Sequence, residues 1–559
     1  MTTRPRALLA LTAVLLATLP LARATAPASV AAAAVDDRPN VVLVLLDDMS
    51  MELLRTMRSA RTMRDTGAWY PHSYVVDSLC CVSRASTFTG QYPHQTGVLL
   101  NVSVRDDSGD PRGGWPAFVQ HGNQERTVAV RLRQSGYTTG YVGKYLNEYD
   151  YRPGRKVPPP IPGWDMLDVV FFSAYDGWDF WSSELVDGRT EVRHHPAPPS
   201  SASRREKDRA YAGRFIERTA LDFVRDAERG DAPYFLQVAP YAPHGRVHAS
   251  GHYPHDPFFP PAFRDRPHPG RPDGNCGRVA CRSLSLRDLR GYGDQQGDNR
   301  PRRADGRPGA LWNRHPHVHG AAPTLRMLRS RVQMLQSADR MVRRLLRQVG
   351  PDTYVILTSD NGFHLGQHGL RAGKGTPYTS DIRVPLLVVG PGVRPGRRRE
   401  LVSNLDLAPT LERLAGLEPA PYRSGRSLLP SLARPWLHEQ DYVFVEHTWG
   451  RKRPDDPDAK GGSALGVIPS YVAVRSRTQL LVRFDLDRSA AQRFVWEFYD
   501  LSEQGFEKRN DYGAPRHRRA VRVLTRKIEQ LDACSTVVRG DAVPDGCRSL
   551  TRHTRAVTP

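Results

Sequence analysis

The chain has 559 residues, and its 80 Lys and Arg residues against 59 Asp and Glu residues give a formal net charge of +21. Hydrophobic residues make up 39% and charged residues 25%, a composition that excludes a largely disordered chain and indicates a globular one. The length predicts one large domain and a smaller one. The basic excess fits either a composition that keeps the protein soluble or attraction to polyanions such as nucleic acid, anionic glycans or acidic surfaces.

The first 34 residues have the pattern of a signal peptide. Arg4 and Arg6 form a basic start, and the stretch from Ala7 to Leu21 is mostly apolar. Ala22-Arg23-Ala24, or the alanine run that ends at Ala34, would serve for cleavage. No later stretch reaches about 18 apolar residues. We therefore expect a secreted protein with no membrane span.

Strand-like and helix-like segments alternate over residues 35–435 and predict an α/β fold with a largely parallel sheet. Val41–Leu46 is a continuous apolar run rich in β-branched residues, which is typical of a strand buried on both faces. The later predicted strands are Tyr137–Tyr141, Tyr234–Val238, Thr353–Leu357 and Val384–Val389, and the predicted helices are Glu125–Ser135, Ala210–Arg229 and Thr324–Val349. Polar residues repeatedly follow the carboxyl ends of these strands, where open α/β sheets place their sites.

Two regions interrupt this pattern. Residues 250–316 are rich in Arg, Pro, Gly and His without periodicity, so we predict a long insertion loop. Beyond residue 435 the strand-like runs become shorter, and a helix-like stretch follows them. These are Tyr442–Glu446, Tyr471–Arg475 and Leu480–Phe484 as strands, and Arg519–Leu531 as a helix. We expect residues 436–559 to form a small α+β domain.

The six cysteines fall into three close pairs. Cys276 with Cys281 and Cys534 with Cys547 each close a short loop, which predicts two local disulfides in an exported protein. Adjacent cysteines rarely bridge each other. Cys80 and Cys81 are therefore left over as thiols, which is a signal of reactivity.

Two pairs of oxygen donors follow predicted buried strands. Asp47 and Asp48 follow the first strand, and Asp360 and Asn361 follow the strand that begins at Thr353. Either pair alone is more often a turn or a helix cap. If the two strands are neighbours, however, the four side chains converge as hard oxygen ligands, which suit Ca²⁺ or Mg²⁺.

Residues 80–90 read Cys-Cys-Val-Ser-Arg-Ala-Ser-Thr-Phe-Thr-Gly. Ser83 is a reasonable N-cap and Gly90 a plausible terminator, so we predict a short helix with Cys80 at its amino end. That end carries free N–H groups and a partial positive charge, which suit an oxyanion, and Arg84 adds a cation.

This segment resembles the signature of the sulfatase family, Cys-x-Pro-Ser-Arg followed by Thr-Gly. The likeness extends from Arg38 to about Tyr512 and includes Pro39-Asn40, Asp47-Asp48, Gln91–Val98, Gly143–Glu148, Ala242–His244, Thr358–Gly362, Gly373–Tyr378, Asp381–Pro385 and Tyr499–Leu501. The Gly-Lys-Tyr-Leu-Asn form looks most like the N-acetylglucosamine-6-sulfatase and extracellular heparan-sulfatase branch. The resemblance implies an alkaline-phosphatase-like fold, with a large mixed, mostly parallel sheet flanked by helices and a smaller α+β C-terminal domain.

The resemblance also implies roles for individual residues. Cys80 would be oxidised after translation to formylglycine by a formylglycine-generating enzyme, and the hydrate of this aldehyde would be the nucleophile and a metal ligand. The divalent metal, Ca²⁺ or Mg²⁺, would be held by Asp47, Asp48, Asp360 and Asn361. Arg84, Lys144 and Lys374 would stabilise negative charge, and His244 would lie near the leaving oxygen. Taken singly, such lysines and histidines are more often a solvated charge or a loop side chain.

Two positions depart from the family pattern. Val82 replaces the proline of the signature. Because the modifying enzyme would read this segment, we expect conversion of Cys80 to be slower, or not to occur. Many sulfatases have a histidine two positions after the lysine that matches Lys144, where this chain has Leu146. His364, His368 and His94 are the candidate bases for sulfate release, each more often structural or substrate-facing than catalytic. Cys81 is predicted to have no part in the chemistry.

We therefore predict a sulfuric ester hydrolase that acts on a sulfated sugar or glycan, with no nucleic-acid partner. One alternative is a phosphoester or phosphonate hydrolase with a related metal site. Another is a protein that keeps Cys80 unconverted and binds sulfated glycans through its basic surface.

Overall fold

A computed structural model describes residues 36–106, 108–294, 298–313, 319–450, 456–460, 465–487 and 493–552. The predicted signal peptide, residues 1–34, lies outside the described residues. Among the residues described, no helix is both long and apolar enough to cross a membrane.

An eight-stranded mixed sheet forms the centre of the fold, in the order β11-β2-β10-β9-β1-β8-β4-β5. β1 pairs in parallel with β8 and β9, and β4 pairs in parallel with β8 and β5, whereas β10 runs antiparallel to β9 and β2. The strands are β1 (Asn40–Leu46), β2 (Ala68–Trp69), β4 (Thr138–Gly143), β5 (Met166–Val169), β8 (Tyr234–Ala239), β9 (Thr353–Ser359), β10 (Leu386–Val389) and β11 (Gly396–Arg397). The predicted mostly parallel sheet is confirmed.

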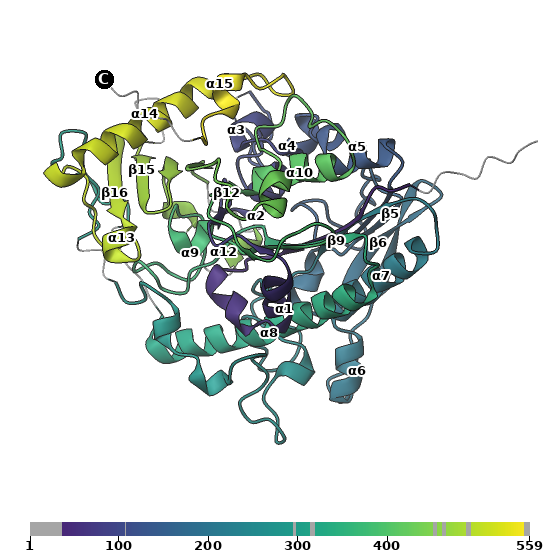
Figure 1. The fold of residues 1–559 in the computed structure, drawn as a ribbon. Coiled ribbons are helices and arrows are strands. Elements are labelled where there is room, and N and C mark those ends of the chain that lie inside the picture. The colour runs from purple at the N-terminus through teal and green to yellow at the C-terminus, as the bar shows by residue number, and fades with distance from the viewer. Residues whose placement is uncertain are drawn as a thin grey trace, which may run out of the picture. The chain divides into compact units, whose positions relative to one another are not determined.

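Helices cover both faces of this sheet (Figure 1). On one face Val42, Val44 and Leu46 pack in a hydrophobic core with α1 (Arg58–Thr66), α7 (Ala212–Ala227) and α8 (Ala321–Gln348). On the other face Val41, Leu43 and Leu45 pack with α2 (Cys80–Thr89), α5 (Val128–Gln134) and α10 (Leu407–Leu414). Because successive side chains of a strand point to opposite faces, the apolar run of β1 supplies both cores, and each buried Val or Leu contributes roughly 1.5–3 kcal/mol.

A second, four-stranded antiparallel sheet lies beyond residue 435. Its order is β13 (Val443–His447), β14 (Ser470–Arg475), β15 (Gln479–Asp485) and β16 (Phe494–Asp500), and α14 (Arg518–Cys534) packs on it. This matches the predicted smaller α+β arrangement, although β16 was missed. The hairpin of β6 (Phe180–Val186) and β7 (Arg189–His195) was also missed, because its polar, half-exposed residues carry a weak hydrophobic signal.

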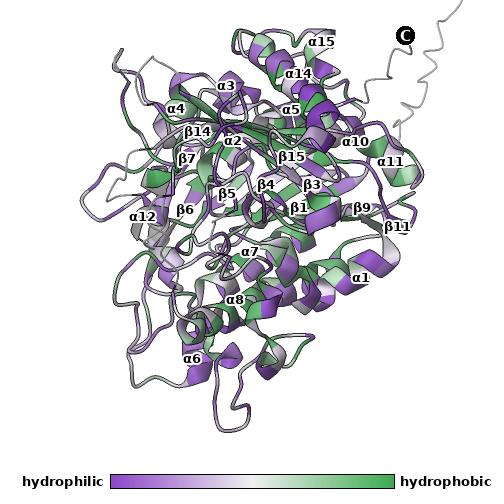
Figure 2. Ribbon diagram, turned by 90° about the vertical axis from the view of Figure 1, so that its left-hand side faces the viewer, coloured by the Kyte–Doolittle hydropathy of each residue, from purple (hydrophilic) through white to green (hydrophobic). Residues whose placement is uncertain are grey.

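The predicted insertion, residues 250–316, contains only short 3₁₀ helices in its described part. Both predicted disulfides are confirmed: Cys276–Cys281 lies within this region, and Cys534–Cys547 joins the last residue of α14 to α15 (Asp545–Arg548). Figure 2 shows the central strands largely in the hydrophobic colour and the outward turns of α6 (Arg204–Arg209) in the hydrophilic colour.

The remaining elements are short. They are the paired strands β3 (Ser73–Tyr74) and β12 (Val402–Ser403), the helices α3 (Pro93–Thr96), α4 (Gly114–Gln120), α9 (Thr379–Ile382), α11 (Leu429–Ala433), α12 (Pro457–Lys460), α13 (Leu501–Gln504) and α15 (Asp545–Arg548), and the 3₁₀ helices η1 (Met51–Thr56), η2 (Gln124–Arg126), η3 (Phe172–Asp176), η4 (Phe263–Asp265), η5 (Cys281–Ser283), η6 (Leu286–Asp288), η7 (Asn404–Asp406), η8 (Leu465–Val467) and η9 (Pro515–His517).

Candidate active site

The two predicted pairs of oxygen donors meet at the carboxyl edge of the large sheet. β1 and β9 are adjacent and parallel, with Leu46 opposite Ser359, so Asp47-Asp48 and Asp360-Asn361 leave neighbouring strands at the same level. The backbone N–H of Asp48 donates to Asp360 Oδ1 at 3.1 Å. Asn361 Nδ2 donates to Asp48 Oδ1 at 2.6 Å. The structure thus brings the four side chains together, as the prediction required.

Two oxygen atoms of this group have no hydrogen-bond partner in the described part of the chain. They are Asp48 Oδ2 and Asn361 Oδ1, and both are buried. His244 Nε2 lies 3.6 Å from Asp48 Oδ2. Because a buried oxygen without a partner is costly, these atoms fit the ligand atoms of a hard cation. Asp47, Asp48 and His244 also offer ligand atoms within 4.8 Å of one another.

Basic side chains from separate elements surround these carboxylates. Lys144 follows β4, and its Nζ lies 2.8 Å from both carboxylate oxygens of Asp47. Lys374 Nζ donates to Asp48 Oδ1 at 2.6 Å. Arg84 Nε, from α2, donates to Asp360 Oδ2 at 2.8 Å. Lys144, Lys374 and Arg84 are all buried, so each cation is fixed in place by an anion.

The charge states of these groups depend on one another. Burial disfavours the charged form of Lys144, but the carboxylate of Asp47 outweighs it and the pKa of Lys144 is raised. Burial likewise opposes the charge on Lys374, whereas Asp458 and Asp48 raise its pKa. Burial raises the pKa of Asp47 to about 6, against the effect of Lys144. The site therefore keeps its lysines charged while it weakens the acidity of one carboxyl group.

His244 follows β8 and is also buried in the site. Its Nδ1 lies 2.6 Å from the carbonyl oxygen of Gly245, and its ring packs against Tyr175 at 4.4 Å between centroids. Burial lowers the pKa of His244, but the carboxylates of Asp48 and Asp47 raise it, and the net pKa is raised. The ring is held with Nε2 directed at the carboxylates.

The helix that carries Cys80 differs from the prediction at its amino end. α2 begins at Cys80, with Leu79 as N-cap, and the N–H of Ser83 donates to Leu79 O within the helix at 2.9 Å. The predicted N-cap at Ser83 is therefore wrong. Asp77 Oδ1 instead accepts from the N–H of Leu79 at 2.6 Å, which sequence spacing did not suggest. Gly90 ends the helix with φ 62°, as predicted.

Cys80 is fully buried beside two asparagines that the prediction did not include among the site residues. Its Sγ lies 3.4 Å from Asn101 Oδ1 and 3.9 Å from Asn147 Nδ2. Burial raises the pKa of the Cys80 thiol to about 12 despite Lys144 and Lys374 nearby. The unmodified thiol is thus a poor nucleophile in the folded protein. Cys81 points elsewhere, and its Sγ accepts from the N–H of Asn147 at 3.1 Å.

Asp458 is a further site residue that the sequence analysis missed. Its Oδ1 lies 3.1 Å from both His244 Nε2 and Lys374 Nζ, and its Oδ2 is 4.0 Å from Cys80 Sγ. Burial raises the pKa of Asp458, but Lys374 and His244 together outweigh burial, so the net pKa is lowered. The residue lies in a highly charged stretch, residues 451–460 (RKRPDDPDAK), whose composition is typical of a solvated loop, so only the tertiary structure places it here.

The three candidate histidines for sulfate release have other partners. His364 Nδ1 contacts both oxygens of Asp381 at 2.9 and 3.0 Å, and His94 Nδ1 lies 2.6 Å from Glu446 Oε1. His368 packs against Tyr378, and burial lowers its pKa to about 4. None of the contacts described for these three rings involves Cys80.

The cluster at the carboxyl edge of the mixed sheet combines buried oxygen donors with two lysines, an arginine and a histidine. Such a combination is typical of metal-dependent proteins that bind an oxyanion. The sulfatase family model matches residues 39–417, and the chain belongs to the sulfatase family. This family generally uses a formylglycine and a divalent metal.

Individual relatives support the same grouping. The extracellular sulfatase SULF-1 homolog of Drosophila melanogaster is 32% identical over 411 residues, which are 71% of this chain and 31% of that protein. The N-acetylglucosamine-6-sulfatase of Homo sapiens is 29% identical over 437 residues, 75% of this chain and 69% of that enzyme. The chain thus spans about a third of the length of the first relative and about two thirds of the second.

The fold is also that of solved structures. One, described as in complex with its substrate D-glucosamine-2-N,6-O-disulfate, has a TM-score of 0.60 at 18% identity, covering 89% of this chain and 98% of the other. This similarity confirms the predicted fold.

Proposed function

We propose that this protein is a sulfuric ester hydrolase that releases sulfate from a sulfated sugar or glycan. One observation carries the proposal. Cys80 lies in one buried cluster with the lysines, arginine and histidine that an anionic ester requires and with the oxygen donors that a divalent cation requires. The family membership supports sulfate as the anion.

Asp47, Asp48, Asp360 and Asn361 would hold the metal, and the unpartnered oxygens of Asp48 and Asn361 support this assignment. Their all-oxygen donor set favours Ca²⁺, with Mg²⁺ as the second choice. Such an ion supplies a Lewis acid for a sulfate oxygen and promotes ionisation of a hydroxyl nucleophile made from Cys80.

Lysine, histidine and arginine side chains would bind the ester, protonate the leaving oxygen and position the metal ligands. Lys374 and Lys144 supply two fixed positive charges next to the oxygen atoms of the bound ester. The contact of Nδ1 with Gly245 leaves His244 Nε2 facing the carboxylates of Asp458 and Asp48, so Nε2 can donate a proton to the leaving oxygen. Arg84 holds Asp360 and also donates to the carbonyl of Lys144 at 2.6 Å, which positions both groups.

Cys80 would be converted to formylglycine before the chain folds. The side chain has no exposed surface, so a modifying enzyme cannot reach it in the folded protein. Val82, which replaces the signature proline, is also fully buried within α2. It can affect recognition of the extended chain without disturbing the folded site.

The substrate class follows from the relatives. An N-acetylglucosamine-6-sulfatase and an extracellular sulfatase homolog match most of this chain, and we propose a 6-O-sulfated glucosamine residue of a glycan as substrate. The extracellular sulfatase homolog, together with the predicted signal peptide, supports secretion.

Two measurements test the proposal. Mass spectrometry of the Cys80 peptide, from protein made in a host with the modifying enzyme, should find formylglycine in a substantial fraction of molecules. Purified protein should then release sulfate from 6-O-sulfated N-acetylglucosamine faster than it cleaves matched phosphate or phosphonate esters. An entirely unmodified thiol with no sulfate release would favour the glycan-binding alternative, and faster phosphoester cleavage would favour the phosphohydrolase.

A further inference from the structure

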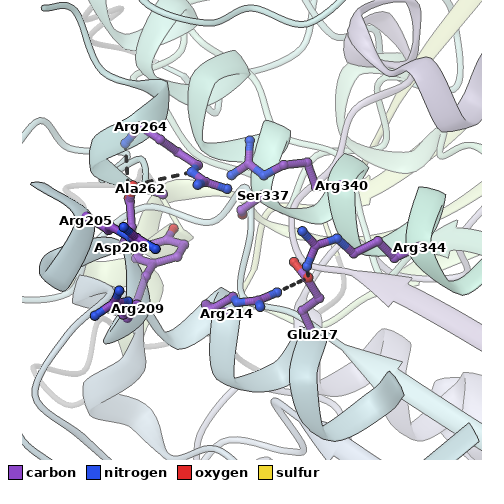
Figure 3. A pocket seen from close by; sticks show the side chains of 12 residues that line it. Arg205, Asp208, Arg209, Arg214, Glu217, Ala262, Arg264, Ser337, Arg340 and Arg344 are labelled. Atoms are coloured by element: carbon purple, nitrogen blue, oxygen red, sulfur yellow. Dashed lines mark hydrogen bonds and ion pairs between the residues drawn. The ribbon is translucent and has the colours of Figure 1, made fainter. Parts of the chain in front are cut away.

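A cation-rich hollow lies outside the proposed active site. It has a volume of about 190 Å³ and lies between α6, α7, α8 and the turn at η4. None of its lining residues belongs to the proposed metal or catalytic set. Figure 3 shows arginine side chains from these different elements around one opening.

Arginines outnumber carboxylates in this hollow. Six arginines line it, at positions 205, 209, 214, 264, 340 and 344, together with the carboxylates Asp208 and Glu217. A third carboxylate, Asp265, contacts Arg340 from behind. Six guanidinium groups against three carboxylates leave a surplus of three positive charges in a small space, which favours an anionic ligand.

Several of these arginines are held in place from the protein side. Arg340 Nη1 and Nη2 lie 2.7 Å from the two oxygens of Asp265, whose side chain is only 1% exposed. One oxygen of Glu217 accepts hydrogen bonds from both Arg214 and Arg344. Because a single carboxylate pairs with two guanidinium groups, N–H donors of Arg214 and Arg344 remain for a ligand. Planar guanidinium groups fixed in this way are suited to the oxygens of sulfate-type anions.

Arg205 and Arg209 complete the opening from α6. Both are exposed, and among the residues that the structure describes neither forms an ion pair with a carboxylate. Substitution of these two arginines therefore removes positive charge without leaving a buried carboxylate unpaired.

The hollow is connected to the proposed active site through α8. Arg331 of this helix contacts the backbone oxygen of Asp48, while Ser337 and Arg344 of the same helix line the hollow. At a rise of 1.5 Å per residue, these positions lie about 9 to 20 Å along the helix from Arg331. The hollow is therefore separate from the proposed active site, and an extended anionic chain is the kind of ligand that could contact both places.

We propose that this hollow binds a sulfate group of an anionic polysaccharide at a distance from the reacting ester. The inference rests on the proposed function for the identity of the chain that reaches both places. It assigns the hollow to affinity for long substrates, with no part in the cleavage step.

A second arginine-lined hollow supplies a comparison. It has a volume of about 480 Å³ and is lined by His72, Arg397, Arg399 and Arg477. Its three arginines are exposed, and no ion pair with a described carboxylate orients them. Removing two arginines here changes the net charge equally but leaves the first hollow intact.

The test compares R205A/R209A with R397A/R477A, both in protein that also carries C80A. The probe is a fluorescent heparin-type octasaccharide, and binding is measured by anisotropy at about 0.1 M NaCl. We expect R205A/R209A to weaken binding by about tenfold and R397A/R477A by less than about twofold. Equal losses in both variants, no loss in R205A/R209A, or no binding to the parent protein would overturn the proposal.

Competition with inorganic sulfate shows whether the hollow binds a sulfate group of a polysaccharide or the free sulfate ion. At matched ionic strength, about 10 mM sulfate should displace the octasaccharide no better than chloride, because one ion cannot replace a multivalent chain. Displacement by sulfate that is lost in R205A/R209A would assign the hollow to the free ion and overturn the polysaccharide assignment.

Turnover separates this inference from the proposed function. With Cys80 intact, R205A/R209A should leave kcat/KM for a small aryl sulfate unchanged and raise KM for the octasaccharide. A tenfold or greater loss on the aryl sulfate would overturn the assignment to affinity. If neither protein cleaves either ester but the difference in binding persists, the proposed function fails and the binding site stands.

Discussion

The proposed active site and the arginine-lined hollow at α6, α7 and α8 both collect positive charge, but they do so differently. In the active site Lys144, Lys374 and Arg84 are buried, and each contacts a carboxylate at 2.8 Å or less. In the hollow Arg214 and Arg344 are 41% and 38% exposed and share one carboxylate. Buried, paired charges fix geometry for chemistry, whereas partly exposed, under-neutralised charges provide salt-sensitive affinity.

The largest expected effect comes from removing Cys80. C80A should lower kcat for a sulfate ester by on the order of 10⁴-fold or more, because the nucleophile is lost. The matched control is C81A, since Cys81 is equally buried but faces the N–H of Asn147. C81A should keep kcat within about threefold. Equal losses in the two variants, measured on folded protein, would remove Cys80 from its assigned role.

Removal of the metal should give the next largest effect. A chelator should lower both the activity and the Tm, and added Ca²⁺ should restore them. Saturation at 100 times the Kd contributes about 2.7 kcal/mol to stability.

Two variants locate the ion responsible for that effect. D360N should abolish the Ca²⁺-dependent rise in Tm. D500N should retain it, because Asp500, Glu503 and His517 form a separate acidic group that could hold an ion. If the rise instead disappears in D500N, the stabilising ion lies outside the proposed active site.

Asp458 offers a more moderate test. Its carboxylate contacts His244 and Lys374, and so competes with an ester sulfate for these two groups. D458N should therefore lower KM for a small sulfate ester by about five- to tenfold. D456N is the control, because Asp456 Oδ1 contacts Asn101 and the N–H of Asp458 instead of the lysine. A hundredfold fall in kcat with unchanged KM would show that Asp458 takes part in the chemistry.

The smallest expected effect is the difference in salt dependence. Raising NaCl from about 0.05 to 0.2 M should weaken octasaccharide binding by about tenfold and change KM for a small aryl sulfate by less than about threefold, because exposed charges are screened more than buried ones. Kd and KM measured over the same salt series provide the check. Parallel slopes would mean that both ligands depend on the same charges.

Much of the large sheet was predictable because its strands carry a strong local signal. The apolar runs at β1, β8 and β9 are buried on both faces, and the polar residues that follow them form the site. The hairpin of β6 and β7 has a weaker signal, since β6 carries two buried serines and β7 is mostly polar with no fully buried residue. The division of the chain at residue 435 stays a prediction.

The amino-acid sequence by itself determined the family signature at Cys80, the donor pairs at Asp47-Asp48 and Asp360-Asn361, and the two short-range disulfides, because each depends on residues close together in the chain. Only the tertiary structure decided that Asp458 contacts His244 across 214 positions, that Asn101 lies against Cys80, and that arginines of three helices share one hollow. The physical reason is that charge pairing acts through space. Local patterns show which residues can carry charge, and the packing of the helices and loops on the sheet decides which of those charges meet.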